Sequence, residues 1–199
     1  MERRPKGYVG ERHETIGSDI LAVLRALTFP LGVLGADTVD QLESVDPEGW
    51  YPIAWLLDLM DRVDRRVGSS GLVKIGRTLF KLSHEARVLQ VVRSARDIVY
   101  GIDGMYRHAN RGVGIGGWTV LSFEPGRATL EKTTPHHCAM EEGILSAGLE
   151  AMRAPSRIAQ SSCFRKGADA CVFEVTSAVT DERWSGESSA IPASSRTRR

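Results

Sequence analysis

The sequence has few of the features that would place it in a membrane or on a nucleic acid. No stretch approaches the roughly 18 consecutive apolar residues of a membrane-spanning helix, and the charged segment 1–6 is not followed by the apolar core of a signal peptide. The 26 lysine and arginine side chains are balanced by 25 acidic ones, which leaves a formal net charge of +1. The large positive field that attracts nucleic acid is therefore missing. We expect a cytoplasmic protein whose partner is neither a membrane nor a nucleic acid.

Cysteine is also scarce, with three residues and no Cys-x-x-Cys pair among them. A small and odd number of cysteines does not build a disulfide scaffold, and the cytoplasm keeps thiols reduced. The three cysteines are therefore expected to be reduced thiols or metal ligands.

What the sequence does contain is one segment of domain length between two polar ends. Residues 1–14 are polar and charged, whereas apolar residues recur from Thr15 onward. Residues 178–199 are rich in serine and arginine and poor in apolar side chains, so they cannot offset the entropy lost on ordering. These boundaries predict a flexible N-terminus over 1–14, a single α+β domain over 15–177 and a flexible tail over 178–199.

Apolar residues at helical spacing fill the first half. One stripe over residues 16–27 stops before Pro30, and a second over 53–67 stops at Gly68. Two further stripes cover residues 72–82 and 86–100. The first half is thus predicted to be helical.

Period-two patterns replace the helical ones after the glycine-rich passage 112–117. Pro125-Gly126 is a turn sequence and predicts a hairpin. The expected elements are, in order, strands over 118–123 and 128–131, a helix over 138–152 and strands over 157–164 and 171–176. The predicted fold is α+β, with N-terminal helices followed by a ββαββ half that forms an antiparallel sheet.

The three cysteines fall where this second half could bring them together. Cys163 and Cys171 flank the connection of the second hairpin, and Cys138 begins the helix before it. Three thiolates suit zinc, and a fourth donor would come from a nearby polar side chain, which could be His136, His137 or Gln160. The alternative is that the thiols are small buried apolar groups, as free cysteines commonly are.

No catalytic constellation stands out. His136, His137 and Cys138 are adjacent and point in different directions, and no acid or oxyanion hole accompanies them. The glycines of 112–117 follow a helix and enter a strand, which reverses the order that places phosphate at a helix N-terminus. We therefore expect a protein that is not an enzyme.

Two further groups of residues each allow a structural and a functional interpretation. The aromatic residues Trp50, Tyr51 and Trp55 are typical of core packing, and Trp50 and Trp55 could instead form an interface. His84 and His108 could each ligate haem iron, although both lie among polar residues, where a solvated histidine is usual.

Two segments of the second half carry a family resemblance. Residues 143–149 are a helix of small residues, and 163–175 holds a cysteine, a glycine-acid turn and a second cysteine before an apolar strand. These motifs resemble the 4-vinyl-reductase domain over residues 100–177. The whole chain, including 49–53 and 71–80, more closely resembles an uncharacterised family of paralogous myxobacterial proteins, which is distantly akin to haem-nitric-oxide-binding domains.

The first resemblance implies a non-enzymatic module that binds a hydrophobic or aromatic small molecule and acts in sensing or signalling. Residues 15–177 would then be one ligand-binding domain, acting as a homodimer or through a partner protein. In the aromatic-sensing members of this family, three cysteines and a glutamate hold zinc, and the matching cysteines are Cys138, Cys163 and Cys171. Gln160 stands where the glutamate is expected, so His137 or its neighbour His136 would have to supply the fourth ligand.

Two other functions stay open. One is a protein-interaction adaptor without a small ligand, and the other is a haem-based gas sensor. A pocket lined by residues of both halves would favour sensing, whereas a filled core with an exposed apolar patch would favour the adaptor.

Overall fold

The structure, a computed structural model, describes residues 9–186. The helices are α1 (Gly17–Ala26), α2 (Pro30–Leu34), α3 (Ala36–Glu43), α4 (Ile53–Leu79), α5 (Glu85–Val91), α6 (Ala95–Ala109), α7 (Cys138–Ala151) and α8 (Glu182–Ser185), with a π-helical turn η1 (Phe80–His84) and a 3₁₀ turn η2 (Phe164–Lys166). The strands are β1 (Glu14–Ile16), β2 (Trp50–Pro52), β3 (Asn110–Arg111), β4 (Trp118–Glu124), β5 (Arg127–Lys132), β6 (Ser156–Ser162) and β7 (Cys171–Ser177).

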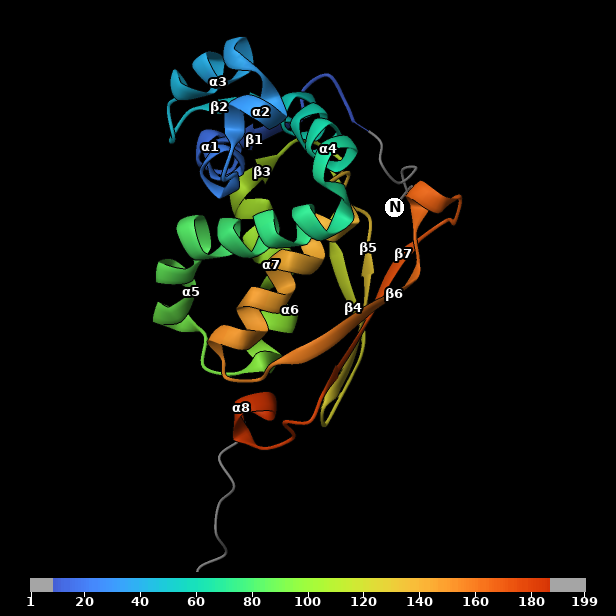
Figure 1. The fold of residues 1–199 in the computed structure, drawn as a ribbon. Helices are drawn as coiled ribbons and strands as arrows, with labels where there is room; N and C mark the ends of the chain where they lie inside the picture. The colour runs from blue at the N-terminus through green and yellow to red at the C-terminus, as the bar shows by residue number, and fades with distance from the viewer. Residues whose placement is uncertain (1–8, 187–199) are drawn as a thin grey trace, which may run out of the picture.

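The four longer strands form one antiparallel sheet in the order β4-β5-β7-β6. Figure 1 shows this sheet along one side of the molecule, with α1, α2 and α3 at one end and α8 at the other. The β5–β7 register places Lys132 opposite Cys171. Because side chains alternate along a strand, Ala128, Leu130 and Lys132 share one face, and all three are buried. A lysine therefore lies in the inward register of the central strand.

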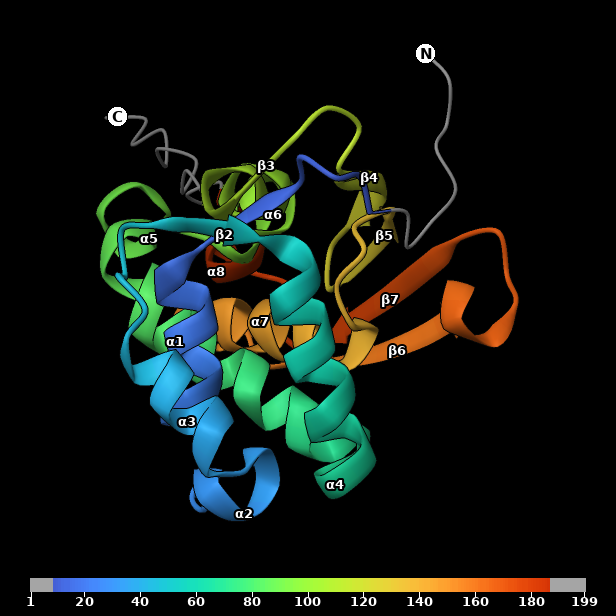
Figure 2. The ribbon, with the colours of Figure 1, turned by 90° about the horizontal axis from the view of Figure 1, so that it is seen from above.

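The three short strands form a second, small sheet in the order β2-β1-β3. Glu14 in β1 pairs with Pro52 on one side and with Arg111 on the other. This sheet ties the start of α1 to the start of α4 and to the end of α6, as Figure 2 shows from above. It thereby holds elements of the first and second halves side by side.

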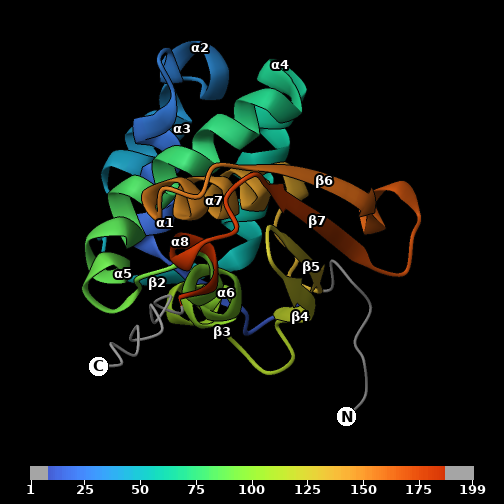
Figure 3. The same ribbon diagram turned by 90° about the horizontal axis from the view of Figure 1, so that it is seen from below.

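Helix α7 lies between α4 and the sheet, and Figure 3 shows it there from below. Its close approach to α4 depends on two glycines. A Cβ atom on Gly76 would lie 1.8 Å from the carbonyl oxygen of Met140, and one on Gly143 would lie 2.1 Å from that of Val73. Real Cβ atoms do not approach backbone oxygens so closely, so only glycine fits at either position. The two helices thus pack backbone to backbone beside the cysteine cluster.

The predicted α+β class is confirmed, and the strands and helix of the ββαββ half lie close to their expected positions. The predicted break at Gly68 is also present, as a kink inside α4 where this residue has a φ of 71°. The helix expected over 86–100 is instead two helices. Ser94 accepts a hydrogen bond from the Asp97 amide, and the Asp97 carboxylate accepts one from the Ser94 amide, so a capping box starts α6.

The predicted end of the ordered domain at residue 177 needs correction. Trp184 in α8 is fully buried, its indole Nε1 donates to the carbonyl of Glu124 at 2.7 Å, and its ring stacks on Phe123. Burial of a whole indole offsets the ordering entropy of this segment. At the other end, His13 is already buried before the expected start at Thr15. The remaining parts of the predicted flexible ends, 1–8 and 187–199, lie outside the described residues.

None of the helices within residues 9–186 combines the length and the apolarity needed to cross a membrane.

Candidate metal centre and polar cavity

The structure brings the three cysteines together in the interior. Cys138 Sγ lies 3.6 Å from Cys163 Sγ and 3.5 Å from Cys171 Sγ, and all three sulfurs lie within 4.8 Å of one another. The three thiols are free and buried. Their separations are too long for a disulfide, whose sulfurs lie about 2.05 Å apart. They are close to the edge of a tetrahedron of thiolates around zinc, about 3.8 Å for a metal–sulfur distance of 2.3 Å.

Three separate elements supply these sulfurs. Cys138 is the first residue of α7, Cys163 follows β6, and Cys171 begins β7. The connection between β6 and β7 is therefore what carries the second and third thiols to the N-terminus of α7. A hydrogen bond from Cys171, together with the charge of Lys132, lowers the pKa of Cys138 to about 4, against the opposing effect of burial. Cys138 is thus held as a thiolate, the form that binds metals.

The other predicted ligands lie differently. The Nδ1 atom of His137 accepts a hydrogen bond from the Ala139 amide, and its Nε2 faces Asp64 Oδ2 at 3.4 Å. His137 therefore caps α7 instead of joining the cysteines, because adjacent residues at a helix start point in different directions. Gln160 does lie beside Cys138 and helps to lower the pKa of this thiol, while its Nε2 has no hydrogen-bond partner among the described residues.

A fully buried lysine contacts the cysteine cluster. Lys132 Nζ lies 3.7 Å from Cys138 Sγ, donates to the carbonyl of His136 at 2.7 Å and pairs with Glu141 Oε2 at 2.9 Å. Burial lowers the pKa of Lys132, and the negative charge of the nearby cysteines opposes that effect. An unpaired charge at this depth would cost several kcal/mol, so its anionic neighbours stabilise it.

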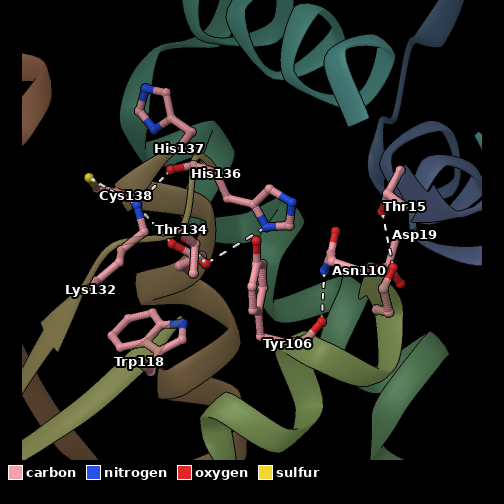
Figure 4. A network of polar contacts seen from close by, with 12 residues as sticks. Thr15, Asp19, Tyr106, Asn110, Trp118, Lys132, Thr134, His136, His137 and Cys138 are labelled. Atoms are coloured by element: carbon pink, nitrogen blue, oxygen red, sulfur yellow. Dashed lines mark hydrogen bonds and ion pairs between the residues drawn. The ribbon is translucent and has the colours of Figure 1, made fainter. Parts of the chain in front are cut away.

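The carboxylate of Glu141 continues this polar path away from the sulfurs. Its Oε1 accepts a hydrogen bond from Thr134 Oγ1 at 2.7 Å and lies 3.7 Å from Nδ1 of His136. The ring of His136 packs edge-on against Tyr106. Figure 4 shows Cys138 and Lys132 at one end of this path, His136 and Tyr106 in the middle, and Asn110, Thr15 and Asp19 at the other end. The path is buried throughout.

The path ends in a cavity of about 30 Å³ between the two halves of the fold. Asp19 of α1 and His84 of η1 line it from the first half, and Asn110 and His136 line it from the second. Within residues 9–186, five buried side-chain atoms have no hydrogen-bond partner, and four of them belong to residues that line this cavity. Glu141 Oε2 is ion-paired with Lys132, which leaves Asp19 Oδ1, Asn110 Oδ1 and His136 Nε2 without a hydrogen-bond partner in this part of the chain. Each of these side chains is only 3% exposed. Three buried polar atoms that face one cavity without partners are costly to protein stability unless a bound molecule satisfies them.

The carboxylate of Asp19 and the imidazole of His84 meet at this cavity, with Oδ1 and Nε2 3.8 Å apart. Burial raises the pKa of Asp19 to about 7. Burial also lowers the pKa of His84 to about 4, helped by the charges of His108 and Arg87. Both groups are therefore held toward their neutral forms, as expected for titratable side chains removed from water.

The predicted interface residues lie near the small sheet. Trp50 is half-buried under the guanidinium of Arg111, 4.2 Å from the ring centre. Trp55 is half-buried and packs edge-on against Tyr51. Both aromatic side chains are thus in contact within the chain, and their role in an interface stays a prediction.

Sequence reasoning missed Lys132, Glu141 and Asp19. Two of them left a signal in the sequence. Lys132 continues the alternation of Ala128 and Leu130 into the core, and Asp19 lies at helical spacing from the apolar stripe of α1. A charged residue at a position where the periodic pattern calls for an apolar one is the signal that would have identified both.

Comparison with known proteins identifies the fold. The sequence matches no protein-family model and no curated protein. Its structure is similar to an H-NOX protein from S. oneidensis in the Fe(II)NO ligation state, with a TM-score of 0.64 and 15% identity over 81% of this chain and 98% of that one. An unliganded Fe(II) H-NOX protein from K. algicida gives 0.63 and 12%, over 81% and 96%. A structure concerned with haem distortion in the H-NOX family gives 0.60 and 11%, over 82% and 95%.

At these identities the likeness shows a shared fold. It confirms, for the fold, the expected kinship with haem-nitric-oxide-binding domains. The resemblance to the 4-vinyl-reductase domain is not supported.

Replacing Asp19 with asparagine should stabilise the protein in a pH-dependent way. The native carboxyl keeps its proton up to about pH 7, whereas the unfolded one loses it near 3.8. Because the native state binds more protons between these values, ionisation of Asp19 lowers the free energy of unfolding as the pH rises through this window. Asp19→Asn removes that loss, so its advantage over the natural chain should grow from near zero at pH 4 to about 2–4 kcal/mol at pH 8.

Urea unfolding across this pH range would measure the difference. Asp40→Asn, which removes an exposed carboxylate from α3, controls for the change in net charge. A difference between Asp19→Asn and the natural chain that stays constant with pH would contradict the account.

Proposed function

We propose that the chain is a non-enzymatic, ligand-binding sensory module whose sensing site is the polar cavity between its halves. The observation that carries the proposal is the set of unpartnered polar atoms on Asp19, Asn110 and His136, all buried and all facing this cavity. A molecule bound there contacts α1 and η1 on one side and α6 and α7 on the other. If the two halves can adopt more than one arrangement, the molecule would favour the arrangement that it binds more tightly. The size of the shift would be set by the difference between its affinities for the arrangements.

The adaptor is the alternative that needs no ligand. Its support is a pair of exposed apolar side chains on and beside α2, Phe29 at 76% and Leu31 at 61% exposure. Two side chains make a small patch, and single exposed apolar residues are ordinary on protein surfaces. The cavity lined from both halves favours sensing.

We further propose that Cys138, Cys163 and Cys171 hold a structural zinc ion. Zinc prefers tetrahedral thiolate sites, and the sulfur separations of 3.5 and 3.6 Å suit one. The thiols are 4%, 7% and 0% exposed, in the order given, so a substrate has no route to a metal held there. The ion would tie the start of α7 to the hairpin of β6 and β7. The fourth ligand would come from Gln160 or a water molecule.

The shared fold supports haem-based sensing as a second candidate. The residues of this chain do not fit haem. A cavity of about 30 Å³ holds about two water molecules. The groove of about 310 Å³ between α5 and α6 lies at the lower end of the range for small-molecule pockets, about 300–1,000 Å³. Of the two histidines that could ligate iron, His84 faces Asp19, and Nε2 of His108 is engaged by Arg87.

Elemental analysis of the purified full chain should find about one zinc per chain and no stoichiometric iron, and the absorption spectrum should lack a haem band. Cys163→Ser should lose the zinc and lower the free energy of unfolding by several kcal/mol, because metal binding contributes to folding. Ser161→Ala, an exposed change on the same strand, should retain both. Absence of zinc after expression in zinc-rich medium would refute the metal site, and stoichiometric haem would refute the haem-free account.

Nuclear magnetic resonance of the labelled full chain tests the sensing site directly. Titration with a panel of small neutral, cationic and anionic compounds should reveal a compound that shifts amide signals of both halves at once, in α1 and η1 and in α6 and α7. Asn110→Leu, which places an apolar side chain in the cavity, should abolish this response, and Gln41→Leu on the exposed face of α3 should leave it intact. A panel that shifts signals in one half only would contradict a site at the junction.

A further inference from the structure

A groove of about 310 Å³ lies between α5 and α6, next to the polar cavity. The two share His84 and Met105 among their lining residues. This volume lies at the lower end of the range for small-molecule pockets, about 300–1,000 Å³. At about 15 to 30 Å³ for each non-hydrogen atom, it has room for roughly ten to twenty such atoms. The groove can therefore hold an organic molecule that the cavity cannot.

The floor of the groove is bare helix backbone. Gly101 and Gly104 are three residues apart on one face of α6, and a Cβ atom on either would meet nothing within 4 Å. Glycine inside a helix costs about 1 kcal/mol relative to alanine. Since no packing neighbour requires glycine at these positions, the open space above α6 is what the two residues provide.

The walls of the groove are apolar. Val88 and Val92 come from α5 and the residue after it, and Ile98 comes from α6. Val91, on the same wall, is 77% exposed. A valine so exposed beside an open groove gains burial when an apolar group enters.

The charged groups around the groove are mostly basic. Arg87 and His108 line it, and Arg87 contacts Nε2 of His108. Within the described part of the chain, no carboxylate lies within 4.0 Å of Arg87. The one acid that lines the groove is Asp97, whose Oδ2 already accepts hydrogen bonds from the amides of Arg93 and Ser94. The guanidinium thus has donors left for an anion, and the acid beside it is engaged in the helix cap.

We infer that this groove binds a small organic anion of roughly ten to twenty non-hydrogen atoms, with its apolar body over Gly101 and Gly104 and its carboxylate or other acidic group on Arg87. The inference goes beyond the proposed sensory function, because it adds a second site next to the cavity and names the class of ligand for it. His84 lies at the boundary between groove and cavity, at the end of the π-helical turn η1. Such turns recur at functional sites, and this one would report occupancy of the groove to the cavity.

Octanoate is a suitable probe because it has a seven-carbon alkyl chain and a carboxylate. Calorimetric titration of the full chain should give tighter binding for octanoate than for 1-octanol, and weaker binding still for octylamine. Arg87→Gln should weaken octanoate binding by about tenfold, the usual effect of losing a charge-assisted hydrogen bond, and leave 1-octanol unchanged. Arg66→Gln, an exposed change on α4, serves as the matched charge control.

A second variant keeps the test independent of charge. Gly104→Leu should fill the groove and abolish octanoate binding while the protein stays folded, because the added side chain enters open space. Gly32→Leu on α2, where the space is also open, should bind octanoate normally.

Each outcome separates this inference from the proposed function. Equal binding of 1-octanol or octylamine would overturn the preference for an anion and leave a ligand-binding groove. Octanoate binding that survives Gly104→Leu would place the site elsewhere and overturn the inference. If none of the three probes binds, the groove is not a site for small organic anions. That result would not bear on the sensing cavity, which is tested separately by the amide shifts that Asn110→Leu should abolish.

Discussion

The ion pair between Lys132 and Glu141 joins the two parts of the candidate site. Its atoms lie 2.9 Å apart, and neither side chain reaches solvent to a useful extent. Lys132 extends from the central strand β5 to the thiol cluster, and Glu141 extends from α7 toward Thr134 and His136. Water does not solvate either charge, so each holds the other in place. We therefore expect the position of α7 against the sheet and the charge beside Cys138 to depend on this pair.

The chain shares its fold with H-NOX proteins, and its interior supports our proposal of a ligand other than haem. Side chains fill the space between helices and sheet down to a cavity of about 30 Å³, which is bordered by apolar side chains together with buried polar ones. The same architecture can serve another ligand because recognition depends on the groups that line a site and not on the path of the backbone. The cavity of this chain is lined from both halves, which is the position that the proposed sensory role requires.

The sequence predicted the ββαββ half well because its signals are local. Alternating apolar residues, the Pro125-Gly126 turn and the apolar face of the 138–152 segment each fix an element without reference to the rest of the chain. The strands of the small sheet escaped notice because β1 and β2 have three residues each and β1 pairs with residues far along the chain. The three cysteines were grouped correctly, since a hairpin brings its flanking residues together. His137 was predicted as the fourth metal ligand, whereas in the structure its ring caps α7. The cavity could not be predicted, since Asp19, Asn110 and His136 meet only through tertiary packing.

A double-mutant cycle on the buried ion pair tests the account most directly. Lys132→Met leaves Glu141 as an uncompensated buried charge, and Glu141→Gln leaves Lys132 with the cysteine cluster as its remaining anionic neighbour. Each change should lower the free energy of unfolding by about 3–5 kcal/mol. The double variant should lose at least about 2 kcal/mol less than the sum of the two single losses, because removing both charges leaves neither unpaired. Single losses below about 1 kcal/mol that add within about 0.5 kcal/mol would contradict the dependence of the site on this pair.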